Sequence, residues 1–318
     1  MAKALAAQET GWWMGLNPLL GLSLERAQQI YDAARRGCSP LLHRVYDAIE
    51  AADPVLMTCV ERRSSALAGL GWHSTARAGV DDGLAKEQRQ FIDDLADGIG
   101  DLEEALEHLD LAFFRGFSHV QPVWEGGRVR RIQTLDSWNF MRRADGTWLW
   151  NPEAKEGDGG GLEEITPEAR LVTVRRPRAI DYPAMAIHIR KALGERDWGR
   201  FVERYGIPPV DAVMAAGATE EQRNEYLAAA EAARDGRCVV WPSGSTVSRA
   251  EGARGQDPFS AFQEHQERLV VLMATGGTLT SLAQADTGSL AGGAPMAVGE
   301  ASVRRDGKII GAALARAL

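Results

Sequence analysis

The run DPFSAFQEHQERLVVLMATGG, residues 257–277, decides how this chain is organised. Asp257 is a side-chain acceptor of the kind found at helix N-caps, and Pro258 lacks the N–H that a first helical turn leaves unpaired. Apolar residues then recur at helical spacing, at Phe259, Phe262, Leu269, Val270 and Met273. The run therefore predicts an amphipathic helix over residues 257–275, which ends at Gly276-Gly277.

The composition changes sharply after this helix. The residues GGTLTSLAQADTGSLAGGA, 276–294, hold five Gly, five Ser or Thr, four Ala and one Asp, with no Lys or Arg. Such a segment lacks the apolar side chains to bury a core, so it predicts a mobile loop. Pro295 then begins a last helix, residues 295–318, with apolar contacts such as Val298 and Ile310 and a basic set of Arg304, Arg305, Lys308 and Arg316.

Several stretches carry a family resemblance. ATGGTLTS at 274–281, TGSLA at 287–291 and VRRD at 303–306 are similar to the C-terminal signature of portal proteins of Mu-like bacteriophages. ADPV at 52–55, ERR at 61–63 and ALAGLGW at 66–72 resemble the N-terminal signature of that family. GFSHVQPVW at 116–124 resembles a third family segment, with Gln121 where the family usually has Glu, and RDWGRFVERYGIP at 196–208 is the strongest single match.

Composition and length indicate an ordinary globular protein. The 318 residues are 45% apolar and 25% charged, and the length suggests two or three compact parts. No apolar run approaches a membrane span and the N-terminus lacks a signal-type segment, so we expect a soluble chain made in the cytosol and no membrane partner. Cys38, Cys59 and Cys238 show no metal-ligand or CxxC spacing and are interpreted as reduced.

The charge is unevenly placed. Residues 81–110 contain eleven acids against Lys86 and Arg89, a net −9, while the whole chain carries −8. Phosphate neutralisation dominates tight DNA binding, and no basic face is visible in the sequence. If DNA is a partner, we expect the protein to let it pass without recognising its base sequence.

Periodicity and turn signals place the remaining elements. We expect helices at 23–36, from 40, from 54 to Gly69, at 84–97, 102–114 and 183–206, and from Thr219 to about Arg234. Strands are expected at 117–124 and 128–135 about a Gly126-Gly127 turn, at 148–150 and 171–174, and at 238–241 and 246–249. Two long helices therefore bracket a small α/β module.

The resemblance implies a fold for this order of elements. It is α+β, the phage portal fold with an α/β wing, a two-helix stem, a small α/β clip and a reduced crown. The implied parts are an N-terminal arm (1–36), the wing (37–182), a descending stem helix (183–206), the clip (207–256), an ascending stem helix (257–275), a tunnel loop (276–294) and a wing or crown helix (295–318).

Site residues follow from these assignments. The tunnel loop predicts a DNA-channel surface at Gly277, Thr278, Thr280, Ser281, Thr287, Ser289 and Gly292. Aromatic residues predict packing of the stem helices, laterally in a ring, at Trp198, Phe201, Tyr205, Phe259 and Phe262.

Catalytic chemistry is not indicated. The glycine runs at 157–161 and 276–277 have no P-loop Lys, the six histidines show no HExxH spacing, and no GxSxG elbow occurs. We therefore predict no catalytic residue, no metal and no cofactor.

The function implied by the resemblance is a homo-oligomeric ring, dodecameric in the family, at one capsid vertex of the virion. It would be assembled in the host cytoplasm and would pass double-stranded DNA during packaging and ejection. Its partners would be the major capsid protein, the terminase large subunit and a head-tail adaptor. Two alternatives stay open: a soluble α/β enzyme or ligand-binding protein, and another head or neck protein that only contacts the capsid.

Overall fold

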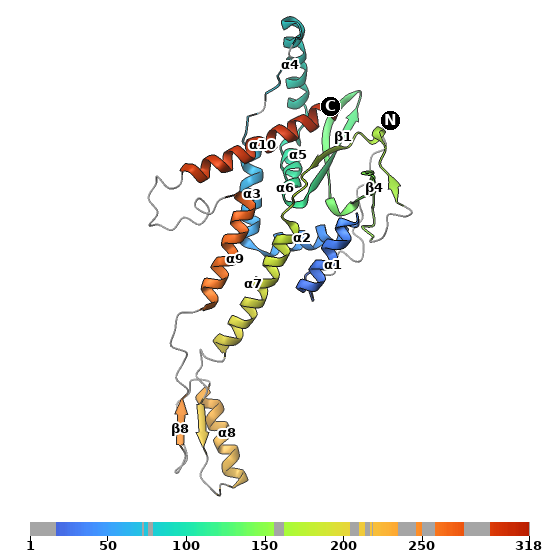
Figure 1. Cartoon of the computed structure of the whole chain (residues 1–318). Helices are drawn as coiled ribbons and strands as arrows, with labels where there is room; N and C mark the ends of the chain where they lie inside the picture. The colour runs from blue at the N-terminus through green and yellow to red at the C-terminus, as the bar shows by residue number, and fades with distance from the viewer. Residues whose placement is uncertain are drawn as a thin grey trace. The chain divides into compact units, whose positions relative to one another are not determined.

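The computed structural model describes residues 17–71, 73–75, 79–155, 162–203, 210–213, 217, 219–234, 246–249, 258–276 and 293–317 (Figure 1). The chain divides into two compact units, one of Met1–Ile189 with Glu267–Leu318 and one of Arg190–Gln266. Helices α7 (Asp181–Phe201) and α9 (Pro258–Thr275) each run through a boundary between the units. Among the described residues, no helix is long and apolar enough to span a bilayer.

The first unit contains seven further described helices. They are α1 (Leu24–Arg35), α2 (Pro40–Ala52), α3 (Pro54–Ala68), α4 (Asp82–Asp97), α5 (Leu102–Asp110), α6 (Ala112–Arg115) and α10 (Gly293–Ala317). Side-chain caps begin three of them, α1, α3 and α4. Ser23 caps α1 through the N–H of Arg26, and the Asp53 carboxylate accepts two N–H groups of α3 at 3.0 and 3.2 Å. These caps confirm helix starts that the sequence predicts.

Several predicted helix boundaries were wrong, including the start of α10, which lies at Gly293 and not at 295. The helix expected at 102–114 is split at Leu111, whose N–H donates to the His108 carbonyl three residues back, so the α-helical ladder is interrupted. Helix α4 begins two residues early because Asp81 caps it through the N–H groups of Gly83 and Leu84. Helix α7 begins at Asp181, ahead of the predicted 183, because a proline is tolerated in the first turn, where the backbone N–H groups have no intrahelical acceptor.

Two small antiparallel sheets complete the first unit. The first has the order β2-β1-β6, from β2 (Arg128–Leu135), β1 (Phe117–Glu125) and β6 (Val172–Arg175). The second has the order β3-β4-β5, from β3 (Phe140–Arg142), β4 (Trp148–Trp150) and β5 (Glu163–Glu164). Gly126 and Gly127, with φ of 58° and 79°, turn β1 into β2 as the sequence predicts.

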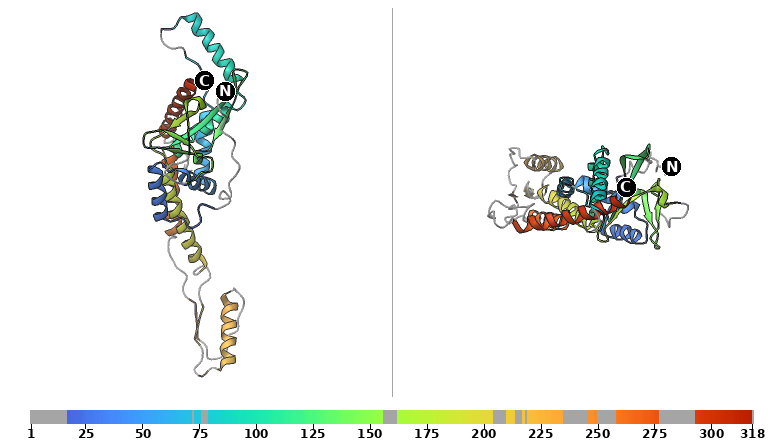
Figure 2. Two further views of the ribbon diagram at one scale, coloured as in Figure 1. Left: turned by 90° about the vertical axis from the view of Figure 1, so that its right-hand side faces the viewer. Right: turned by 90° about the horizontal axis from the view of Figure 1, so that it is seen from above.

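Two large cores and a smaller cluster of Leu135, Phe140 and Trp150 hold the first unit together. One large core is helical and joins α1, α2, α3, α7 and α9, with Tyr46, Met185 and Val271 among its fully buried residues. The other lies between the β2-β1-β6 sheet and a helix layer of α3, α5 and α10 (Figure 2). The last helix is therefore part of a core, although it follows a segment rich in small residues and free of Lys and Arg.

The second unit contains α7 from Arg190 onward, α9 up to Gln266, β7 (Val210–Val213), α8 (Glu220–Arg234) and β8 (Thr246–Arg249). Thr219 and Gln222 bond each other's backbone N–H at the start of α8, which confirms the predicted cap. Strand β8 is confirmed, but it pairs with β7, which the sequence did not predict. The strand predicted at 238–241 lies outside the described residues. The unit contains the predicted clip, 207–256.

Candidate functional site

The candidate site is the pair of helices, α9 and α10, that flank residues 277–292. All seven predicted channel residues, Gly277, Thr278, Thr280, Ser281, Thr287, Ser289 and Gly292, lie outside the described residues. What the structure does describe is how each end of this segment is held.

Helix α9 fixes the entry to the segment. Val270, Val271 and Ala274 are at most 2% exposed and belong to the helical core. The Thr275 hydroxyl donates to the Val271 carbonyl at 2.7 Å, and the Gly276 N–H donates to the Leu272 carbonyl at 2.9 Å. Gly276 has a φ of 77°, the left-handed conformation that ends a helix. The last turn of α9 is thus fixed up to residue 276.

Helix α10 fixes the exit. Val303, Ile310 and Leu314 are buried in the core that it shares with α3, α5 and the sheet. A Cβ on Gly307 would lie 3.4 Å from a methyl of Leu67 and 3.5 Å from one of Leu70, which is ordinary van der Waals contact. An alanine would therefore also fit at this position, where α10 lies against Leu67 and Leu70.

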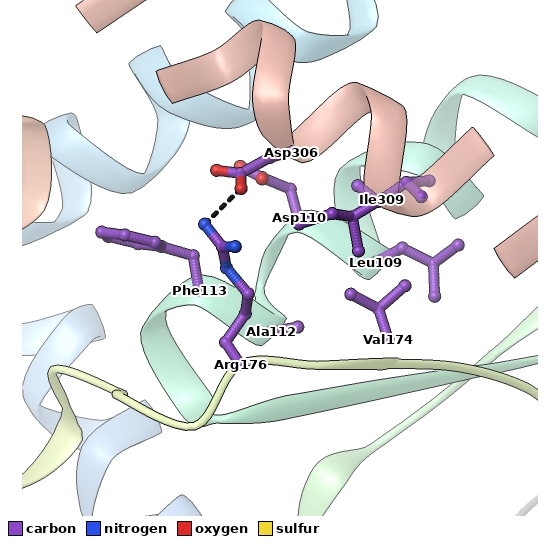
Figure 3. A pocket seen from close by; sticks show the side chains of 9 residues that line it. Leu109, Asp110, Ala112, Phe113, Val174, Arg176, Asp306 and Ile309 are labelled. Atoms are coloured by element: carbon purple, nitrogen blue, oxygen red, sulfur yellow. Dashed lines mark ion pairs between the residues drawn. The ribbon is translucent and has the colours of Figure 1, made fainter. Parts of the chain in front are cut away.

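A buried ion-pair network joins α10 to the body of the unit. Asp306 on α10 pairs through one carboxylate oxygen with Arg63 of α3, and through the other with Arg176, which follows β6. Figure 3 shows the second pair, with Asp110 of α5 beside it. The Arg63 Nε lies 3.6 Å from the Asp110 carboxylate, and the four residues together balance two positive and two negative charges.

Burial sets the electrostatics of this network. Asp306 is 4% exposed, Asp110 3% and Arg63 7%, so each charge depends on its neighbours for stabilisation. Burial raises the pKa of Asp110 to about 6, while the Arg63 guanidinium beside it opposes that rise. The Arg63 guanidinium also lies over the Phe113 ring, 3.8 Å from its centroid. The network acts as an anchor that fixes the rotation of α10.

The region around the ion pairs has no room for a substrate. Leu109, Phe113, Val174 and Ile309 line a cavity of about 10 Å³ beside the ion pairs, room for about one water molecule and too small for a substrate. Within the part of the chain that the structure describes, no group of three His, Cys, Asp or Glu side chains is placed to hold a metal ion.

Three of the five predicted stem aromatics meet inside one subunit. The rings of Trp198 and Phe259 are parallel, with centroids 6.5 Å apart, and those of Phe201 and Phe259 are 5.5 Å apart. Phe262 is 39% exposed on α9, and Tyr205 lies outside the described residues. Their role in contacts between neighbouring subunits stays a prediction.

Helices α7 and α9 also contact each other through polar and small residues. The Gln263 side chain donates to the Lys191 carbonyl at 3.0 Å. A Cβ on Gly194 would lie 2.9 Å from the Gln263 Nε2 and 3.1 Å from the Phe262 ring, so only glycine fits without a shift.

Sequence reasoning missed the ion-pair network, although a signal for it was present. Asp306 falls in register with the apolar positions Val303, Ile310 and Leu314, spaced i, i+3, i+7 and i+11 from 303. Arg63 falls in the same way among the apolar positions of α3. A charge on the apolar face of each of two helices is a signal for a buried pair.

Comparisons with known proteins give a family match. The family model described as the portal protein of Mu bacteriophage matches residues 43–318. The Mu-like prophage FluMu protein gp29 of Haemophilus influenzae is 24% identical over 290 residues, covering 85% of this chain and 54% of that protein. The chain thus spans about half the length of this curated relative.

Solved structures show the same fold at low sequence identity. A chain from the neck of an empty GTA particle, computed with C6 symmetry, superposes with a TM-score of 0.52 and 15% identity, over 76% of this chain and 71% of that chain. A chain from the neck of the native GTA particle, computed with C12 symmetry, gives 0.52 and 14% over 76% and 70%. At this identity the likeness supports the fold alone.

Proposed function

Because this chain belongs to the family of the portal proteins of Mu bacteriophage, we propose that it assembles into a closed ring through which double-stranded DNA enters and leaves a phage head. Portal proteins are structural, non-enzymatic proteins, and the chain is assigned no reaction. The ring would be built from twelve copies, as the C12 symmetry of the similar neck suggests, and would occupy one vertex of the virion.

The observation that carries the proposal is a segment without Lys or Arg between two anchored helices. Residues 277–292 contain no Lys or Arg, while the end of α9 packs on the helical core through Val271 and Ala274 and α10 is held by Asp306 in a buried ion-pair network. Phosphate contacts by cations are strong, so a channel that passes DNA quickly keeps its narrowest surface free of them. We propose that residues 277–292 form that surface, contact DNA weakly and read no bases.

The remaining parts take their roles from the same proposal. Residues 37–182 and 295–318 form the wing and its returning helix, and residues 207–256 form the clip. The terminase large subunit and later a head-tail adaptor dock on the ring, and the major capsid protein surrounds it. Assembly takes place in the host cytoplasm.

A deletion tests the channel segment. Removing residues 279–290 is expected to leave rings intact but to abolish DNA packaging or retention in a reconstituted packaging reaction. The matched control removes residues 157–160, part of the other glycine-rich segment, and is expected to package normally. Normal head filling by the 279–290 deletion would refute this role of the segment.

A further inference from the structure

Helix α4 has a large exposed apolar face. Phe91 is 65% exposed and Leu84 is 48% exposed, while only Ala85 of this helix is buried. In both Figure 1 and Figure 2 the helix stands away from the other helices of its unit. A 16-residue amphipathic helix with so little burial in its own chain is stabilised mainly when another surface covers its apolar face.

The exposed face of α4 is acidic as well as apolar. Leu84, Glu87, Phe91 and Asp94 follow one another at i, i+3, i+7 and i+10, so they share one face, and all four are exposed. The Gln90 amide donates to the Asp94 carboxylate at 2.8 Å and holds that carboxylate at the edge of the face. The face therefore alternates large apolar side chains with carboxylates.

Helix α10 presents a complementary surface. Ala301, Arg305, Lys308, Ala312 and Arg316 are exposed at i, i+4, i+7, i+11 and i+15, again on one face. They line a shallow groove together with Arg304 and the half-buried Ile309. Cations alternate here with small apolar residues, which leaves space for large side chains of a partner.

We propose that α4 of one subunit docks its Leu84, Glu87, Phe91 and Asp94 face on the Arg305, Lys308 and Ala312 groove of α10 in a neighbouring copy of this chain. Phe91 and Leu84 cover the small residues of the groove, and Glu87 and Asp94 pair with Arg305 and Lys308. The contact joins two different faces of the same chain, so it is heterologous and repeats around a closed ring. This inference rests on the proposed ring and names the contact that closes it.

The chemistry favours a second copy over nucleic acid as the occupant of the groove. A phosphate backbone would satisfy the cations of α10, but it would leave the exposed Phe91 and Leu84 in water. The acidic helix of a neighbour satisfies the cations and buries these apolar side chains in one contact, and charge complementarity fixes its register.

Charge reversal and rescue test the contact. In the full chain, Glu87→Lys with Asp94→Lys is expected to raise the protein concentration needed for ring assembly by about tenfold, as is Arg305→Glu with Lys308→Glu. Combining all four substitutions is expected to restore assembly, because the lysines on α4 then face glutamates on α10 of the neighbouring copy. Glu103→Lys with Glu104→Lys, the same charge change on exposed residues of α5, is the matched control and is expected to assemble like the unaltered chain.

The outcomes separate this contact from the ring itself. If the unaltered chain forms rings and both charge-reversed variants assemble equally well, the proposed contact is overturned. The proposed function then still stands. Failure of the unaltered chain to form rings would overturn both. Loss of DNA binding in the Arg305→Glu, Lys308→Glu variant with unchanged assembly would assign the groove to nucleic acid and also overturn the contact.

Discussion

Replacing Asp306 by Asn tests the anchor of α10. The substitution keeps the shape of the side chain but removes one of two buried carboxylates that balance Arg63 and Arg176. It leaves two guanidinium groups, one of them only 7% exposed, with Asp110 as their only carboxylate in the network. Breaking a buried pair in this way costs about 3–5 kcal/mol.

The magnitude is large enough to measure in thermal unfolding. For a unit of this size a destabilisation of 1 kcal/mol lowers Tm by about 2–4 °C, so we expect a fall of about 6–20 °C. Faster hydrogen exchange is expected across α10 in particular, since that helix loses its polar anchor. The matched control is Glu300→Gln on the same helix, where the Arg304–Glu300 pair spans 3.5 Å with both side chains more than 60% exposed. That change should cost less than about 0.5 kcal/mol. Equal Tm values for the two variants would refute the argument that burial makes the Asp306 network an anchor.

Three further predictions concern His43, Gly194 and ATP hydrolysis. Burial lowers the pKa of His43 to about 3, so below pH 6.5 the unfolded chain binds a proton that the folded chain excludes. His43 should therefore lower the free energy of unfolding by about 2 kcal/mol between pH 7.5 and pH 5. Urea titrations of His43→Leu should lack this part of the pH dependence. An unchanged dependence of the free energy of unfolding on pH would contradict the prediction. The Gly194→Leu variant should be less stable than the control Gly199→Leu by about 1–3 kcal/mol, because of these two positions only 194 lacks space for a side chain. Equal denaturation midpoints of the two variants would show that α7 and α9 do not pack closely at Gly194. The purified chain should hydrolyse no ATP, and turnover that persists through repeated purification would contradict the structural role.

Local signals predicted most of the helices and strands. Asp53 and Thr219 cap helices as their residue types indicate, and Gly126-Gly127 forms the turn between β1 and β2. These features depend on side chains within a few residues of the backbone that they bond, so the sequence contains the necessary information.

Features that depend on distant residues were not predicted. Strand β7 at 210–213 is short and acquires its partner β8 more than thirty residues later, so local periodicity did not reveal it. The Arg63–Asp306 pair joins residues 243 positions apart. The spacing of Asp306 within an apolar stripe indicates burial, but which cation it meets depends on how α10 crosses α3.

Electron cryomicroscopy of the purified, assembled chain tests the central claim most directly. The account predicts a closed ring in which residues 277–292 of every subunit face the central channel, with α4 of each subunit against α10 of the next. A monomer under assembling conditions, or a ring with residues 277–292 on its outer wall, would contradict it.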